Sequence, residues 1–328
     1  MTATAPASAA DRAASLLHDS LVWDMVFIYE PDMGNATNLF DRYLAAGVNF
    51  ISVHPAGDRH NVGDAIKRIA RARTEIKAHP RAMLVGSVAE IIAAREAGKL
   101  AVGLHLEGFR PLERDLNLIE TYYQLGVRFV HPIFNLINEI GGGCADRYDI
   151  GLTKFGVKVV HEMNRVGMLV DGSHAGYRAS LDMIEVSHDP VIFSHLACYG
   201  VFPHMRNAKD DQIKACAGKG GVIGITGAGF YLGEVSPERY FRHLDYVAQM
   251  VGVQHVGIGL DYLDNVAPLE ALIDARPDEW PGKEQMAFFG PDRLDRVVEL
   301  MLGAGYKDDD VRAVLGGNWL RICGQVWK

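Results

Sequence analysis

Cysteine is scarce in this chain, and the few that occur stand far apart. Cys144, Cys198, Cys216 and Cys323 are the four cysteines among 328 residues, and no two of them form a CxxC pair. This usage favours reduced structural thiols over a disulfide framework. It is typical of a cytoplasmic protein.

A long apolar run and a basic stripe are also missing. No apolar segment approaches the roughly 18–20 residues that span a bilayer, and the N-terminus shows no signal-peptide pattern. The formal net charge is −8 and the pI is near 5.9. These features argue against nucleic acid or an anionic membrane as a partner. We expect a cytoplasmic protein that acts on a small-molecule substrate.

What the sequence does contain is a regular alternation of short apolar runs and amphipathic stretches. Eight runs read as buried strands, and most are followed by a helical pattern, which predicts an α/β fold of the (β/α)₈ TIM-barrel type. A doubly wound open sheet is the alternative, but no glycine-rich dinucleotide fingerprint supports it. The predicted strands are residues 21–27, 48–54, 100–107, 127–134, 168–174, 191–195, 221–226 and 255–261, with a short extra strand at 83–87.

The helical patterns lie between these strands, and several end at a glycine. No repeat or linker divides the chain, so we expect one barrel domain over residues 1–328. Residues 1–20 would form an N-terminal extension, and residues 292–328 would form extra helices packed on the barrel. The predicted helices are residues 88–97, 113–125, 155–166, 178–187, 210–219 and 237–250.

Two histidines, His174 and His195, stand twenty-one residues apart, and each ends a predicted strand. A strand, a helix and a second strand fit this interval, so the two imidazoles should lie side by side at one rim of a parallel sheet. Neighbouring strands are about 5 Å apart. The two side chains can therefore bind one metal ion, although two unrelated histidines at strand ends are the alternative.

Other polar side chains fall at the same predicted rim, where the chemistry of barrel enzymes collects. His54 ends the second predicted strand, while His105 and Glu107 share one face of the third. Asp261 ends the eighth. Carboxylates and imidazoles are the ligands of a hydrolytic zinc site, and a free carboxylate such as Asp261 can accept a proton from water. His131 precedes Pro132, which favours a structural role.

At these residues the chain resembles the membrane (renal) dipeptidase family of metallopeptidases, which have amidohydrolase-type barrels. Asp171-Gly172-Ser173-His174 resembles the DxSH strand end of that family, and Ser194-His195 resembles its second SH. Further motifs follow in the same order. They are Leu106-Glu107-Gly108, Arg206-Asn207, Lys219-Gly220-Gly221-Val222-Ile223-Gly224, Gly257-Ile258-Gly259-Leu260-Asp261-Tyr262 and Gly317-Asn318-Trp319-Leu320-Arg321.

The resemblance implies a two-metal site that hydrolyses dipeptides, and it implies a role for each matching residue. Glu107 would bridge both metals, and His174 and His195 would complete the second. Asp261 would serve the first metal and the catalytic water. Arg206 would bind the substrate carboxylate, which suits a guanidinium group. Members of the family are often dimers, so a homodimer is a further expectation.

The first strand departs from the family pattern. The family carries DGHxD there, whereas this chain has Val26 and Ile28 at the two ligand positions. The family also has a substrate-contacting histidine after its fourth strand, and the equivalent position in this chain falls near Phe134. We expect Phe134 and Asn135 to contact substrate. We therefore expect one Zn²⁺ per chain rather than two, bound by Glu107, His174 and His195, and an apolar pocket.

Two neighbours could replace the missing ligands: His105, on the same face as Glu107, and His54. Three functions stay open. The first is a zinc-dependent hydrolase of a dipeptide or related small amide. The second is a barrel hydrolase or lyase for a small non-peptide carboxylate. The third is a homologue that binds a ligand without catalysis.

Overall fold

The computed structural model describes residues 8–30, 36–280 and 284–328. Within these residues, neighbouring parallel strands pair in the order β6-β5-β4-β2-β1-β9-β8-β7. The short strand β3 is not part of this order and pairs with β4. The two ends of the path meet: Asp171 forms a parallel bridge with Ile192, and the Gly172 amide donates to the Ile192 carbonyl at 2.8 Å. The sheet is therefore closed, and the predicted (β/α)₈ barrel is confirmed.

The strands lie where the apolar runs predict them. Most are shorter than predicted, because the polar residues at their carboxyl ends lie in the following loops. β6, for example, ends at Val170, four residues before His174. β3 is the predicted short extra strand. The strands are β1 (Trp23–Phe27), β2 (Phe50–Gly57), β3 (Ala82–Leu84), β4 (Leu100–Glu107), β5 (Val127–His131), β6 (Leu169–Val170), β7 (Phe193–Leu196), β8 (Ile223–Ile225) and β9 (Val256–Ile258).

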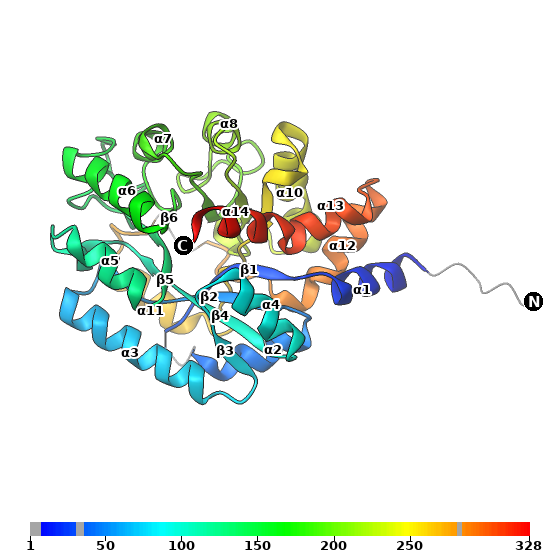
Figure 1. Ribbon diagram of the computed structural model, residues 1–328. Helices are drawn as coiled ribbons and strands as arrows, with labels where there is room; N and C mark the ends of the chain where they lie inside the picture. The colour runs from blue at the N-terminus through cyan, green and yellow to red at the C-terminus, as the bar shows by residue number, and fades with distance from the viewer. Residues whose placement is uncertain (1–7, 31–35, 281–283) are drawn as a thin grey trace, which may run out of the picture.

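Helices surround the strands on all sides (Figure 1). Each of the six predicted helices is present, although α5 begins at Asn117 because Glu113 and Arg114 adopt positive φ. The pattern did not predict α3. The main helices of the barrel are α2 (Phe40–Ala45), α3 (Val62–Ala78), α4 (Val88–Glu96), α5 (Asn117–Gln124), α6 (Lys154–Val166), α7 (Tyr177–Val186), α8 (Asp210–Gly218), α9 (Gly229–Leu232), α10 (Pro237–Val251) and α11 (Ala267–Ala275).

The chain ends pack together on one side of the barrel. Of the predicted extension 1–20, residues 1–7 lie outside the described part, and α1 (Ala9–Asp19) contacts α12 (Leu294–Gly303) and α13 (Asp308–Arg312). A π-helical turn, η6 (Ala313–Gly317), leads into α14 (Asn318–Val326). None of the helices in the described ranges has the length and apolar character of a membrane span.

The motif at the start of α14 closes the bottom of the barrel rather than serving the rim. The amide of Asn318 donates to the Val256 carbonyl at 2.8 Å, and the indole of Trp319 donates to the Ile258 carbonyl at 3.0 Å. Trp319 packs in a buried cluster with Trp23 and Phe50. The carboxyl-terminal rim is thus left as the open end.

Candidate metal centre

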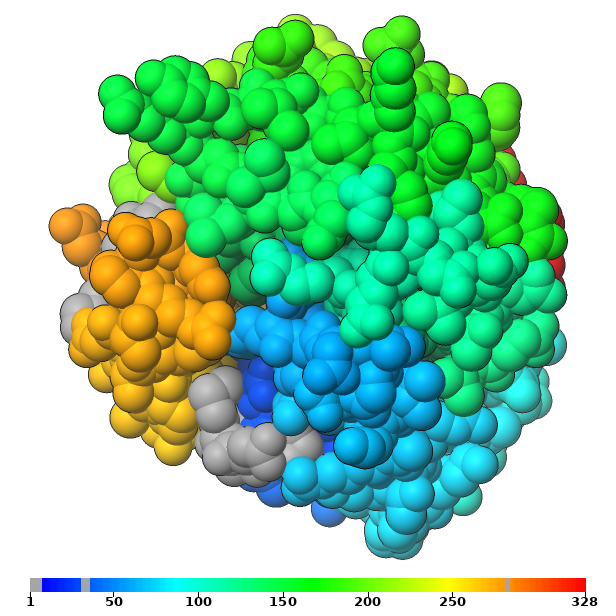
Figure 2. Space-filling view, turned by 90° about the vertical axis from the view of Figure 1, so that its left-hand side faces the viewer, coloured from blue at the N-terminus to red at the C-terminus, as the bar shows by residue number. Residues whose placement is uncertain are grey.

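The carboxyl ends of the strands bring the predicted polar residues together at the open rim. Glu107 ends β4, and His195 lies within β7, while His174 and Asp261 lie in the loops that follow β6 and β9. Figure 2 shows a hollow on this face, bordered by the yellow-orange segment that carries α11 and by the blue segment that follows β2. One cavity there is lined by Glu107, His174 and Asp261.

His174 and His195 face each other with their Nε2 atoms 2.8 Å apart. Their other nitrogens are occupied: Nδ1 of His174 lies 2.7 Å from Oδ1 of Asn135, and Nδ1 of His195 lies 2.8 Å from Oγ of Ser194. With the proton on Nδ1 in both rings, the two Nε2 atoms have free lone pairs and can bind one cation. With the proton on one Nε2, the same contact is a hydrogen bond between the rings.

Glu107 completes this donor set. One carboxylate oxygen of Glu107 and one ring nitrogen each of His174 and His195 lie within 4.8 Å of one another. Two imidazoles and a carboxylate form a common ligand set of catalytic zinc, and hydrogen bonds to the second ring nitrogen are usual in such sites. The three residues therefore fit a divalent metal ion.

Burial keeps these imidazoles neutral. Removal from water, and next the positive charge of Arg206, lower the pKa of His174 and of His195 well below the usual range. A neutral imidazole is the form that coordinates metal. The rings are thus held as ligands rather than as proton donors at neutral pH.

Several residues at the rim have a left-handed backbone conformation. Three of the six non-glycine residues with positive φ in the described ranges are Asn135 (55°), His174 (67°) and Asp261 (52°). A left-handed conformation is costly for a residue such as His174 and tends to occur at functional sites. Beside it, a side chain at Gly143 would meet the Asn135 carbonyl at 2.1 Å, which explains the glycine-rich loop.

Asp261 is held by its own amide, which donates to the Val26 carbonyl at 3.0 Å. Removal from water, followed by the negative charge of Glu107, raises the pKa of Asp261 well above its usual range. The departure from the family motif at Gly259 also has a structural cause. A Cβ at this position would lie 1.8 Å from the Ser194 carbonyl, so no side chain fits.

The first strand supplies apolar surface instead of ligands. Val26 is fully buried, and Ile28 lines the cavity. Phe134 stacks on His174 with ring centroids 4.3 Å apart. Sequence reasoning missed the rest of this wall, because it comes from loops and short helices after β8 and β9 that have no strand-end signal. Its members are Phe230, Tyr231, Leu269, Leu272, Trp280 and Phe288.

Arg206 lies behind the two imidazoles and is only 5% exposed. Its Nη2 donates to the His195 carbonyl at 3.0 Å and lies at the same distance from Nε2 of His195. Its guanidinium carbon lies 5.5 Å from the ring centroid of Tyr231. Cys144, also near this rim, has its Sγ 3.4 Å from Oδ1 of Asn135, and burial raises its pKa to about 11, so the thiol is not activated.

His54 and His105 both approach Glu107 from the opposite side. Nδ1 of His54 lies 3.8 Å from Oε2 of Glu107, and Nε2 of His105 lies 3.9 Å from Oε1. His131 joins them, since a nitrogen of its ring lies within 4.8 Å of the donor atoms of His105 and Glu107. Sequence reasoning assigned no ligand role to His131.

Comparison with known sequences agrees with this geometry. The profile of the membrane dipeptidase family (peptidase family M19) matches residues 42–328. A Schizosaccharomyces pombe protein described as an uncharacterized dipeptidase is 30% identical over 250 residues, which are 73% of this chain and 55% of that protein. The chain therefore matches about half the length of this relative.

Solved structures share the architecture. An amidohydrolase from Pseudomonas aeruginosa has a TM-score of 0.87 at 27% identity and covers 96% of this chain and 99% of its own. A metallopeptidase from Rhodobacter sphaeroides, liganded with a phosphinate mimic of the dipeptide L-Ala-D-Ala, has a TM-score of 0.77 at 20% identity, covering 94% and 100%. With the family profile matching nearly the whole barrel, the chain belongs to the membrane dipeptidase family.

Proposed function

We propose that this protein is a metal-dependent hydrolase that cleaves a dipeptide or a related small amide. The observation that carries the proposal is the convergence of Glu107, His174 and His195 within 4.8 Å at the open rim of the barrel. These residues would hold one Zn²⁺. Zinc there would polarise the substrate carbonyl and lower the pKa of a bound water.

Asp261 is the proton acceptor of this proposal. Its carboxyl group lines the same cavity as Glu107 and His174. A bound Zn²⁺ would favour the ionised form of Asp261 and so offset its raised pKa. The carboxylate would then take a proton from the attacking water and return it to the leaving amine nitrogen. Positive φ at Asp261 fixes the side chain at the rim, which limits the number of orientations that it can adopt.

Arg206 is proposed to bind the carboxylate of the substrate. Nε and Nη2 are occupied by the neighbouring histidines, and no hydrogen bond from Nη1 occurs within the described ranges. A guanidinium group directs N–H donors in a planar fork that suits a carboxylate. The dipeptide mimic bound to the Rhodobacter sphaeroides relative supports a substrate of this kind.

The apolar wall favours a substrate with an apolar side chain. Ile28, Leu269, Leu272 and Trp280 line one side of the cavity. Glu30, an acidic side chain that also lines the cavity, forms ion pairs with Arg59 at 3.6 Å and Arg68 at 3.1 Å. An acylated amino acid, which has no free amino group, is therefore the second candidate substrate.

The test is a hydrolysis assay with L-Leu-D-Ala, L-Ala-D-Ala and N-acetyl-L-leucine, each with and without Zn²⁺. We expect zinc-dependent hydrolysis of a leucine-containing substrate. Faster cleavage of N-acetyl-L-leucine than of either dipeptide would select the acylated class. Absence of hydrolysis of all three by zinc-loaded protein would contradict the proposal. Asp264→Asn, an exposed change near the rim, is the matched control for Asp261→Asn.

A further inference from the structure

One nitrogen in each of three imidazoles, and one carboxylate oxygen, have no hydrogen-bond partner among the described residues. The atoms are Nε2 of His54, Nε2 of His105, Nδ1 of His131 and Oε1 of Glu107. His105 and His131 are fully buried, and His54 is 7% exposed. Leaving a buried polar atom unpaired costs about 1–3 kcal/mol. Three of these residues, His105, Glu107 and His131, have donor atoms within 4.8 Å of one another, so unpaired polar atoms occur where a ligand could bind.

The two fully buried rings are held so that a specific nitrogen of each stays available. Nδ1 of His105 lies 2.9 Å from Oγ of Ser52, and the ring stacks on Phe129 with centroids 4.3 Å apart. Nε2 of His131 lies 2.8 Å from Oδ2 of Asp171. A hydrogen bond from the second nitrogen fixes the tautomer and the orientation of a metal-binding imidazole. Both rings have this feature.

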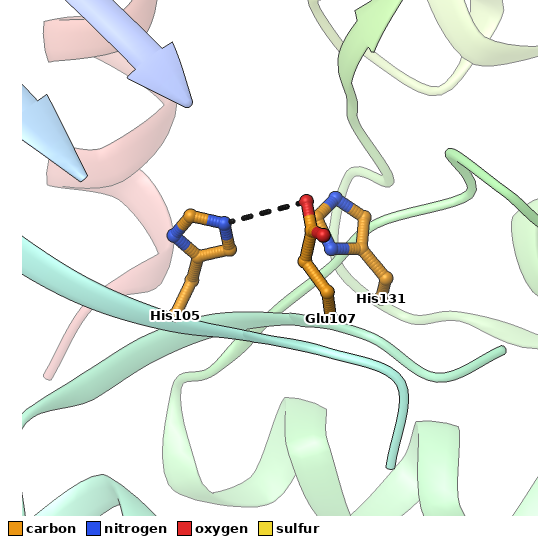
Figure 3. A group of neighbouring side chains, drawn as sticks. All are labelled: His105, Glu107 and His131. Carbon is orange, nitrogen blue, oxygen red and sulfur yellow. Dashed lines mark ion pairs between the residues drawn. The ribbon is translucent and has the colours of Figure 1, made fainter. Parts of the chain in front are cut away.

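The available atoms are close enough for one ion. The donor atoms of His105, Glu107 and His131 lie within 4.8 Å of one another. Figure 3 shows the Glu107 carboxylate between the two rings, with the contact to His105 drawn as a dashed line. Imidazole nitrogen with a single carboxylate oxygen suits Zn²⁺, Co²⁺ or Fe²⁺ better than Mg²⁺ or Ca²⁺.

We propose that His105, Glu107 and His131, with His54 beside them, form a second binding site for a divalent transition-metal ion. Glu107 has two carboxylate oxygens, so it can contribute to this site and to the site of His174 and His195. The proposal goes beyond the single zinc of the proposed function. It assigns the ligand role to residues of β2, β4 and β5, because the side chains of Val26 on β1 and of Ile28 just after it have no donor atom.

The proposed site adjoins the cavity at the rim through two of its residues. His54 and Glu107 both line the cavity that also holds His174 and Asp261. Two cations joined by one carboxylate lie close enough to act on one substrate, as in other two-metal hydrolases. The second site would therefore belong to the reaction centre rather than to the scaffold.

The experiment is a Co²⁺ titration of the full chain after removal of metals, followed by visible absorption and by elemental analysis. We expect two Co²⁺ per wild-type chain, and one in His105→Gln and in His131→Gln. His195→Gln should lose the other site and also retain one. His243→Gln is the matched control, because this buried histidine bonds to Cys198 and Leu232 and should leave two.

One Co²⁺ per wild-type chain, unchanged in His105→Gln but lost in His195→Gln, would overturn the second site and keep the proposed function. No bound metal at all would overturn both. If His105→Gln or His131→Gln does not fold, anomalous diffraction from wild-type crystals soaked in Co²⁺ decides the question. A peak between His105 and His131 is expected, and a single peak between His174 and His195 would refute the proposal.

Discussion

Oδ2 of Asp171 lies 2.8 Å from Nε2 of His131, and both side chains are fully buried. Asp171 Oδ1 also accepts the Ser173 amide at 2.9 Å and the Ser194 amide at 3.2 Å. One carboxylate therefore joins β5, the turn after β6, and β7, where the barrel closes. Asp171 in the DxSH motif therefore connects the segments that carry His174 and His195.

Replacing Asp171 with Asn should destabilise the fold. The change removes a buried carboxylate that accepts hydrogen bonds from His131 and from two backbone amides, which costs about 1–3 kcal/mol. Urea unfolding of the metal-free protein measures this loss directly. Asp309→Asn, at an exposed ion pair with Arg312, should change stability by less than about 0.5 kcal/mol. Equal effects of the two substitutions would show that Asp171 does not support the barrel closure.

Asn135→Ala should weaken zinc binding by about 10–100-fold, because the variant no longer orients Nδ1 of His174. The site requires this contact, which is 2.7 Å long in the structure. Competition with a chromogenic chelator gives the zinc affinity. An unchanged zinc affinity together with a raised KM would instead indicate that Asn135 binds substrate, as the sequence predicts.

Asp261→Asn should lower kcat by about 10²–10⁴-fold, because an amide cannot accept the proton of the attacking water. The zinc affinity of the His174 and His195 site should stay within a few-fold of wild type. Steady-state kinetics on zinc-loaded protein gives both kcat and KM. A change in KM alone would mean that Asp261 contacts the substrate without taking the proton.

The apolar wall should appear as a preference for large aliphatic side chains. One methylene in such a pocket changes kcat/KM by about 10–200-fold. Wild-type protein should therefore prefer leucine to alanine in matched amides by at least tenfold, and Trp280→Ala should reduce that ratio. Tyr148→Ala, at a side chain that is 71% exposed, is the control. An equal loss on both substrates would contradict a role in selectivity.

Asp24 should make stability depend on pH. Burial raises the pKa of this carboxyl to about 7. Since the folded pKa exceeds the unfolded value of about 4, the contribution of Asp24 is complete below pH 4 and is lost as the pH rises through 7. Asp24→Asn should gain about 3 kcal/mol over wild type between pH 5 and pH 8. Urea unfolding at both pH values tests this, and a constant difference would disprove it.

The sequence predicted the barrel and the convergence of Glu107, His174, His195 and Asp261 at one rim, because strand-end positions follow from period and order. It did not predict the role of Asn135 as a partner of His174, which depends on the close approach of the loop around Gly143. The binding partners of a side chain across strands are set by barrel closure. This closure is a tertiary feature that no local pattern contains.

His131 and Trp280 illustrate the same limit. His131 precedes a proline, which suggested a structural histidine. A nitrogen of its ring lies within 4.8 Å of the donor atoms of His105 and Glu107 because β5 pairs with β4 in a register that sets His131 beside Glu107. Trp280 follows α11 in a loop with no hydrophobic period, and its place in the cavity wall depends on how that loop folds back over the rim. Sequence patterns predict neither the position of His131 beside Glu107 nor that of Trp280 in the cavity wall.

Anomalous diffraction at the zinc edge, from crystals of the protein grown with Zn²⁺, would locate the metal that we propose Glu107, His174 and His195 bind. We expect a zinc peak within coordination distance of Nε2 of His174, Nε2 of His195 and a Glu107 oxygen. A fully occupied zinc elsewhere, with these three side chains unbound, would contradict this proposal.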